Sequence, residues 1–351
     1  MKKIRYLAGA LAALLLISLL AGCGGKKEPE GLFYKASGID PKSTIAAVNG
    51  REITAEEYLY WLAYECERIA VDRGSVKWGE VIADGVTYGE YAKRTALADV
   101  TQYAAVRTMA EKSGVTLSQE DREQLQQNKD EDISRSGGRE EYLRHLAMMG
   151  ISEEAYDRIN EGHMLLTRLM ELGGTEGSPV YPTEQELEAF SQGKDFTTVR
   201  LIALPIAGLD EKARADQQTL LADCAEQIRE AEDPCAKLAE LSESLGQSDG
   251  DRDQTLGSDI IDPTLMKAVG ELKEGEVSDV VTTAGAMCVA LRRPLDESAI
   301  AREYFDRRLV EARTTAKVEV SASYKSLDVG KFYPALVELR KTMFDEPAVN
   351  E

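Results

Sequence analysis

The chain has 351 residues, of which 43% are hydrophobic and 30% are charged, a balance typical of a soluble globular protein with room for two domains. Its formal net charge is −20 at pH 7. Removing the three basic residues among the first 22 positions leaves 39 basic residues against 62 acidic ones, or −23. So acidic a chain repels phosphate backbones, and we expect no nucleic-acid partner.

The N-terminus is typical of an export signal. A basic start precedes an apolar run from Leu7 to Leu20, which as a helix would span about 21 Å and fall short of the ~30 Å hydrocarbon core. The small residues before Cys23 resemble the bacterial lipobox, which implies cleavage after residue 22 and acylation of Cys23. We therefore expect a lipoprotein on the outer face of the bacterial cytoplasmic membrane. An uncleaved signal anchor is the alternative.

Local start signals predict that residues 54–192 are mostly helical. Asn49-Gly50 joins two short apolar runs, which is a β-hairpin pattern. Thr54 and Glu57 form the pattern of a capping box, in which side chains satisfy the first backbone N–H groups. Further helices are expected over 88–112 and from the caps Ser118, Ser152 and Thr183.

A change of composition at Phe196 predicts a compact α+β module of about 100 residues. Its expected elements are a strand at 197–206, helices at 211–230 and 234–244, a polar loop at 245–259, a helix and a strand start within 263–283, and a strand at 285–293. Helical periodicity returns after Pro294, and a strand pattern follows at 317–324. The acidic last stretch is expected to be frayed.

Three features together resemble the PrsA/SurA family of extracytoplasmic foldase lipoproteins. The stretch "AAVNGREITAEEY" (46–58) resembles the opening of that family's helical chaperone domain. The stretch "LKEGEVSDVVTTAG" (272–285) resembles a parvulin-type peptidyl-prolyl isomerase module, and a lipobox precedes both. The resemblance implies an α+β fold in which N- and C-terminal segments build a mostly helical, SurA-N-like chaperone domain around an inserted parvulin-like domain. The implied ranges are a signal peptide 1–22, a lipidated tether 23–43, chaperone segments 44–194 and 295–345, the parvulin-like domain 195–294 and a tail 346–351.

The resemblance also implies an isomerase site whose polar residues are replaced. Parvulin modules carry one histidine where Leu201 stands and another where Met287 stands, and the only histidines, His145 and His163, lie outside the module. Rotation of an X–Pro bond has a barrier of about 18–20 kcal/mol, and lowering it requires polar groups near the carbonyl beside an apolar seat. The predicted degenerate isomerase site consists of Leu201, Ile261, Leu265, Met266 and Met287, and the last four of these would form the apolar proline seat. We therefore assign no catalytic residue and expect weak or no isomerase activity.

The expected partners are unfolded or partly folded exported proteins, including X–Pro segments, and the membrane; a homodimer stays open. The candidate client-binding residues are the aromatic side chains of Tyr58, Tyr60, Trp61 and Tyr64. Core packing with partial exposure is the alternative interpretation of this cluster. No cofactor or metal is expected, since the chain has neither a phosphate loop nor a zinc-type Cys/His spacing.

Two functional alternatives and one disulfide remain open. The chain could be an active peptidyl-prolyl isomerase, or a solute-binding lipoprotein of a transporter. The latter would need two βαβ lobes around a cleft, which the helical pattern of 54–192 disfavours. A bridge between Cys224 and Cys235 would require a helix break at Asp233-Pro234, because eleven residues of continuous helix separate them by about 16 Å.

Overall fold

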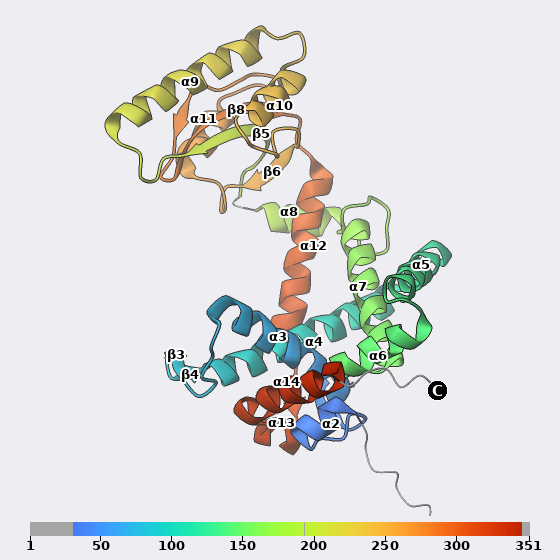
Figure 1. The fold of residues 1–351 in the computed structure, drawn as a ribbon. Coiled ribbons are helices and arrows are strands. Elements are labelled where there is room, and N and C mark those ends of the chain that lie inside the picture. Colours follow the sequence, from blue (N-terminus) through green and yellow to red (C-terminus); the bar gives the residue numbers. More distant parts are fainter. Residues whose placement is uncertain (1–30, 193, 346–351) are drawn as a thin grey trace, which may run out of the picture. The chain divides into compact units, whose positions relative to one another are not determined.

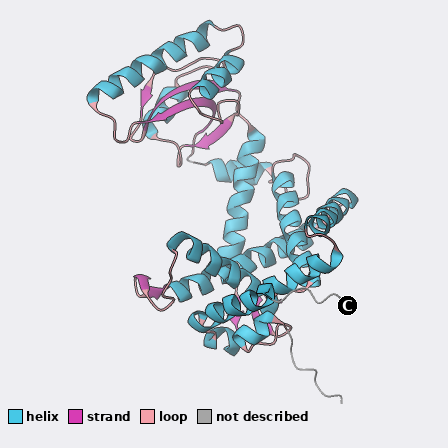
Figure 2. Ribbon diagram, viewed as in Figure 1, coloured by secondary structure: helices cyan, strands magenta, loops and turns pink. Residues whose placement is uncertain are grey.

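The computed structural model describes residues 31–192 and 194–345. The expected signal peptide (1–22), the lipidation site Cys23 and the tail (346–351) lie outside the described residues. Helices carry most of the described chain, and its strands form three small antiparallel sheets, so the predicted α+β class is confirmed (Figures 1 and 2). None of the helices within these residues combines the length and apolarity needed to cross a membrane.

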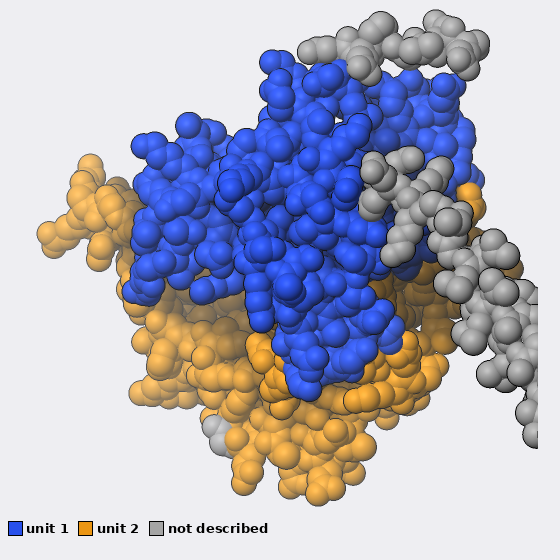
Figure 3. Space-filling model, turned by 90° about the horizontal axis from the view of Figure 1, so that it is seen from below, with its two compact units in different colours: residues 1–101, 127–159, 317–351 blue, residues 102–126, 160–316 orange. Residues whose placement is uncertain are grey.

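The chain divides into two compact units, each assembled from segments that are distant in sequence (Figure 3). Unit 1 holds the described parts of Met1–Thr101 and Lys317–Glu351, together with Gln127–Ile159. Unit 2 holds Gln102–Gln126 and Asn160–Ala316. Three helices contain residues of both units, namely α4 (Tyr88–Ser113), α5 (Gln119–Arg135) and α7 (Glu153–Gly173).

The sheet of unit 1 joins the two ends of the described chain. The predicted hairpin is confirmed, because Asn49 and Gly50 both adopt positive φ between β1 (Thr44–Val48) and β2 (Arg51–Thr54). On its other edge β1 pairs antiparallel with β9 (Val318–Val320), in the strand order β2-β1-β9. A C-terminal strand thus completes a sheet that an N-terminal hairpin begins.

Helices cover this small sheet and bury both chain segments. The remaining elements that lie wholly in unit 1 are α2 (Leu32–Ser37), α3 (Ala55–Arg73), the hairpin β3 (Val81–Ala83) and β4 (Val86–Thr87), α6 (Arg139–Met149), α13 (Ala322–Ser326) and α14 (Val329–Asp345). The expected frayed end is wrong over α14, whose Phe332 and Leu336 are fully buried. Phe332 packs against Phe33 of α2 with ring centroids 6.2 Å apart, so part of the stretch expected as a tether belongs to the folded unit.

Unit 2 combines a helical part with the α+β module. Its helical part includes α8 (Glu184–Ser191), which starts with a complete capping box at Thr183, and α12 (Glu297–Thr314). Phe305 of α12 is fully buried with Val106 of α4 and Leu169 of α7. The helical return after Pro294 therefore packs into the core of this unit.

The module is a four-stranded antiparallel sheet with helices on both faces (Figure 1). The strand order is β6 (Gln254–Gly257), β5 (Phe196–Pro205), β8 (Ala286–Arg293) and β7 (Val281–Thr282). One face packs against α9 (Glu211–Glu230) and α10 (Pro234–Ser244), and the other against α11 (Pro263–Gly270). Strand β6 lies inside the predicted polar loop; its four residues form a strand because they pair with β5. Cys66, Cys224, Cys235 and Cys288 are free thiols, so the bridge left open is not formed.

Candidate functional site

The aromatic side chains of helix α3 differ in exposure, from fully buried to half exposed. Thr54 caps the helix by accepting a hydrogen bond from the Glu57 backbone N–H at 3.3 Å. Tyr58 is 0% exposed, and its hydroxyl donates to the carbonyl of Lys93 at 3.3 Å. Burial raises the pKa of the Tyr58 hydroxyl. Tyr58 is therefore a core residue, and of the four client-binding candidates it is the one that cannot contact a ligand without unfolding.

The other three aromatic residues form a supported platform. Tyr64 is 50% exposed, Tyr60 is half-buried, and the two lie one helical turn apart on α3. Trp61, which is 9% exposed, contacts both rings edge-on at centroid distances of 5.7 and 5.8 Å. Such contacts hold the two tyrosines in place, so they present apolar area at a low entropic cost.

Helix α6 adds two methionines beside this platform, and α14 fixes them. The last carbonyls of a helix lack partners within it. Arg340 of α14 satisfies two of them, since its Nε donates to the Met148 carbonyl at 2.8 Å and its Nη2 to the Met149 carbonyl at 3.1 Å. The same guanidinium also pairs with Glu67 of α3. A C-terminal cation is favourable to the α6 dipole as well.

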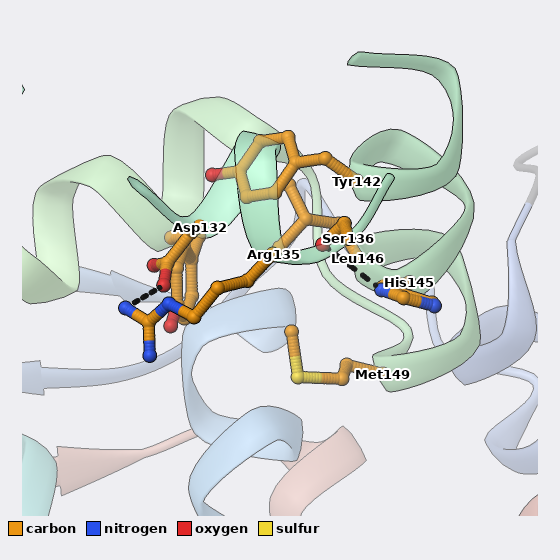
Figure 4. Close-up of a pocket in the computed structure, with 8 residues that line it drawn as sticks. Asp132, Arg135, Ser136, Tyr142, His145, Leu146 and Met149 are labelled. Carbon is orange, nitrogen blue, oxygen red and sulfur yellow. Dashed lines mark hydrogen bonds and ion pairs between the residues drawn. The ribbon is translucent and has the colours of Figure 1, made fainter. Parts of the chain in front are cut away.

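Two cavities of about 330 Å³ each open along these residues and share Met149. The first is lined by Tyr60, Ala63, Tyr64, Glu67, Met148, Met149 and Arg340. The second is lined by Asp132, Arg135, Ser136, Tyr142, His145, Leu146, Met149 and Tyr156 (Figure 4). The rings of Tyr60 and Tyr156 connect the cavities at a centroid distance of 6.4 Å. We name Tyr60, Tyr64, Met148, Met149 and Tyr156 the aromatic–methionine surface, and we count Tyr142, which is 4% exposed, among the core residues that line the second cavity.

Polar groups line one part of the second cavity. Arg135 pairs with Asp132 of the same helix at 2.9 Å, and His145 Nδ1 lies 3.2 Å from the Ser136 hydroxyl (Figure 4). A carboxylate joins the three helices α5, α6 and α7. Glu153 of α7 accepts from Arg139 of α6 at 2.5 Å and pairs with Lys129 of α5 at 2.6 Å. The hydrogen bond from Arg139, with that from Lys129, lowers the pKa of Glu153 to about 2.

The structure divides the residues of the predicted degenerate isomerase site between two sheet faces. Leu201, Ile261, Leu265 and Met266 gather on the face under α11. Met287 lies on the opposite face, in the core with Ile202 and Leu221. The residues of β8 on the α11 face are Ala286, Cys288 and Ala290, and Cys288 pairs with Ala203. Grouping Met287 with the other four is therefore corrected by the strand register, because successive side chains point to opposite faces.

Of the four residues that remain together, Ile261 and Leu265 are core residues, and Leu201 and Met266 are partly buried. Ile261, Leu265 and Cys288 are all buried, and α11 covers them. Burial raises the pKa of the Cys288 thiol. Asp262 precedes α11, and its carboxylate caps that helix by accepting from the Thr264 N–H at 2.8 Å. That carboxylate also accepts from the Ala284 N–H at 3.3 Å, so its role is to hold the loop before β8.

Sequence reasoning missed part of the aromatic–methionine surface. Tyr156 lies on α7, and Arg340, which supports the methionines, lies on α14; no local pattern brings them to α3. A usable signal exists for Arg340, since a basic side chain is a common partner of carboxylates and of the last carbonyls of a helix. His163 belongs to unit 2, where its Nδ1 is 3.0 Å from the Tyr103 hydroxyl.

Comparison with known proteins gives structural neighbours only. No family model matches the chain, and no curated protein matches it. Among solved structures, the foldase protein PrsA from Streptococcus pneumoniae is similar at 14% identity and a TM-score of 0.29, over 77% of this chain and 94% of that one. The peptidylprolyl isomerase PrsA from Bacillus anthracis shows 16% identity and a TM-score of 0.27, over 73% and 99%. A SurA-like chaperone of Campylobacter jejuni shows 11% and 0.24, over 80% and 99%. The solved structures similar to this chain thus include PrsA foldases and SurA-like chaperones, at identities and TM-scores too low to assign an activity.

Proposed function

We propose that this chain is a membrane-anchored, extracytoplasmic folding factor that binds non-native exported polypeptides at the aromatic–methionine surface. The observation that carries the proposal is the pair of adjoining cavities of about 330 Å³ that share Met149. Non-native chains expose the apolar side chains that a native fold buries, and an exposed apolar surface with polar edges suits them. Methionine adapts to ligands of varied shape, while the tyrosines supply rigid contact area.

Release from such a surface requires no nucleotide. A client that folds buries the same apolar side chains that the surface had contacted, so folding itself removes the ligand. Each contact is then weak and reversible, because the surface competes with the client's own core for the same groups. The cycle needs only that the client be held long enough to avoid aggregation.

We further infer that the parvulin-like module has weak or no isomerase activity. An isomerase must stabilise a twisted amide, which requires hydrogen-bonding groups near the carbonyl. The side chains gathered under α11 are aliphatic or thiol groups, and both histidines lie on α6 and α7. A proline-peptide assay with the full mature chain (residues 23–351) tests this inference, and acceleration above the uncatalysed rate would support the active-isomerase alternative instead.

Anchoring is proposed through a lipid on Cys23. The lipobox-like residues before Cys23 motivate the assignment, and acyl chains contribute about 0.8 kcal/mol per buried CH₂ group. Fractionation of a bacterial host that expresses the full chain tests it. The natural protein should sediment with membranes and carry a labelled fatty acid, whereas Cys23→Ser should lose the label. Equal labelling of both forms would refute the assignment.

An aggregation assay on a reduced, proline-limited client tests the chaperone proposal. The mature chain should suppress aggregation, and the combined variant Tyr60→Ser, Tyr64→Ser and Met149→Ser should lose most of this effect. Tyr91→Ser is the matched control, because Tyr91 is a 40% exposed tyrosine of α4 outside both cavities.

A second form of the assay separates the contribution of the α+β module from that of the rest of the chain. A chain with residues 195–295 excised removes the module and keeps the aromatic–methionine surface. Equal suppression by this form would place the activity in the remaining helical body. Failure of both the mature chain and the excised form to suppress aggregation would refute the proposal.

A further inference from the structure

Strand β5 is longer than its neighbour on one side. Strand β8 pairs with β5 from Thr198 to Pro205, whereas β6 pairs with it only from Phe196 to Val199. Within the described part of the module, the β6 side of residues 200–205 therefore has no strand partner. An unpaired strand edge presents N–H and C=O groups to any extended chain that can reach it.

A side-chain amide occupies this open edge. Gln247 Oε1 accepts a hydrogen bond from the Ala203 N–H at 3.3 Å, and Gln247 Nε2 donates to the Ala203 carbonyl. A carboxamide carries the same donor and acceptor as a peptide group. Gln247 thus pairs with Ala203 on both of its backbone groups, as one residue of an adjacent antiparallel strand would. The backbone of Ala203 can therefore bind a peptide group at this edge. In this structure the carboxamide of Gln247 takes the place of that peptide group.

The register defines how far the open edge extends. Backbone groups of alternate residues point to the same side of a strand, so the N–H and C=O of Leu201 point the same way as those of Ala203. Pro205 lacks a backbone N–H, so Ala203 is the last residue of this edge that can donate a hydrogen bond to an added strand. The side chains of Leu201 and Ala203 both belong to the face under α11. An added strand would therefore place alternate side chains beside that apolar face.

We propose that an extended segment of non-native polypeptide adds to β5 at Leu201 and Ala203 and displaces the amide of Gln247. Displacement is feasible because Gln247 lies in a polar segment whose Ser248, Asp249 and Asp251 are exposed. A second copy of the chain is the less suitable occupant, since two molecules of net charge −20 repel each other. An exported polypeptide with basic residues is not repelled by the negative charge of this chain.

This inference rests on the proposed function for its ligand, which is non-native polypeptide, but it uses a site separate from the aromatic–methionine surface. Strand pairing holds each amide planar, whereas isomerisation requires a twisted one. A module that binds by strand addition would therefore retain extended segments without turning their X–Pro bonds. Proline would be accepted only at positions of the added strand whose N–H points away from β5.

N-methylation of a probe peptide tests strand addition on the mature chain. The probe is a fluorescent nine-residue peptide of alternating Val and Thr with a lysine at each end. Two further peptides carry N-methyl groups on alternate residues, one set on the odd and the other on the even positions. Methylation at one set of positions should abolish peptide binding, and methylation at the other set should leave the affinity unchanged, because only alternate amides of the peptide donate to β5. Equal binding by both methylated peptides would overturn the proposal.

The variant Gln247→Ala tests displacement. Removing the resident amide should tighten binding of the unmodified peptide by about fivefold and should make the Leu201 amide resist hydrogen exchange once peptide is added. Gln217→Ala is the matched control, because Gln217 donates to the Leu204 carbonyl of the same strand at 3.1 Å. Its peptide affinity should stay at the natural value. If Gln247→Ala binds no tighter than Gln217→Ala, the proposal fails.

Two further readouts keep the conclusions distinct. The N-methyl comparison uses the natural sequence and so does not depend on the folding of Gln247→Ala. Sedimentation of Gln247→Ala that shows a concentration-dependent dimer without peptide would assign the edge to a second copy and overturn the assignment to clients. The Tyr60, Tyr64 and Met149 variant should keep its affinity for the strand peptide while losing aggregation suppression. If this variant no longer suppresses aggregation but still binds the peptide, the result bears on the aromatic–methionine surface and leaves strand addition to β5 unaffected.

Discussion

The aromatic–methionine surface of unit 1 and the sheet face under α11 in unit 2 are both apolar, yet only one of them is open. Tyr64 is half exposed at the rim of a cavity, whereas Ile261, Leu265 and Cys288 are all buried beneath a helix. The first surface also ends in polar tips and guanidinium groups that stay in contact with water. Apolar composition therefore does not distinguish a binding surface from a core, and the packing of a neighbouring helix decides between them.

The same contrast exists along a single helix, and it gives the largest expected effect. Tyr58 is fully buried on α3, while Tyr64 is exposed on another face. Tyr58→Ala should lower the free energy of unfolding by about 3–5 kcal/mol through loss of a buried aromatic ring. Tyr64→Ala should change it by less than about 0.5 kcal/mol while weakening client binding. Urea unfolding of both variants measures the difference, and similar losses would remove the distinction between core and surface on this helix.

Arg340 provides the next largest effect, because it holds the methionines of the open surface. Arg340→Ala leaves the carbonyls of Met148 and Met149 without their donor and removes the ion pair with Glu67. We expect a loss of about 2 kcal/mol in the free energy of unfolding, together with weaker client binding. Lys331→Ala is the control on the same helix, since Lys331 is a highly exposed partner of Asp328 at 3.6 Å. Equal stability of the two variants in thermal unfolding would show that Arg340 does not support this surface.

Local signals in the sequence predicted most helix starts, because a cap involves residues three apart. Thr54, Thr183 and the Asn49-Gly50 turn adopt the geometry that their residue types favour. No helix was predicted over α14, whose interior contains Pro334, a residue that normally opposes a helix interior. Burial of Phe332 and Leu336 against unit 1 outweighs that cost, and such burial is visible only after folding.

Strand register was the other feature that the sequence did not predict. Placing Met287 in the predicted proline seat required knowing which residue of β8 lies opposite Ala203. A shift by one residue moves every side chain to the other face, so a correct strand still gave one misplaced site residue. The aromatic–methionine surface was predicted only as far as α3 reaches, because Tyr156 and the supporting residue Arg340 come from separate helices.

A pH-dependent effect of about 1 kcal/mol is expected at Glu153, which supports the second cavity. Its folded pKa is lowered to about 2 from the ordinary value of 4.5, chiefly by the hydrogen bond from Arg139. A depressed carboxyl pKa contributes stability above the unfolded value, and this contribution is lost as pH falls from about 4.5 toward 2. Glu153→Gln should therefore be less stable than the natural chain at pH 7, and the difference should shrink across that window.

The control for this titration is Glu154→Gln. Glu154 is highly exposed and pairs with Arg158 on the same helix at 2.8 Å. Its substitution should change stability by only a few tenths of a kcal/mol. Urea midpoints measured between pH 2.5 and 7 for both variants test the assignment. A difference for Glu153→Gln that is constant over this range would show that the carboxylate's charge is not what joins α5, α6 and α7.

The smallest expected effect is a difference between the labelling rates of two cysteine thiols. It tests whether the sheet face under α11 becomes accessible in the native state. Cys288 is buried there and burial raises its pKa, so its thiolate is scarce and shielded. Cys235 is only partly buried, at the start of α10. In a soluble form carrying Cys23→Ser, a thiol reagent at pH 8 should modify Cys235 first and Cys288 only at the rate of unfolding. Modification of Cys288 as fast as Cys235 would mean that α11 lifts from the sheet in the native state. The face under α11 would then be a second open apolar surface, and the contrast with the aromatic–methionine surface would be one of equilibrium between open and closed forms.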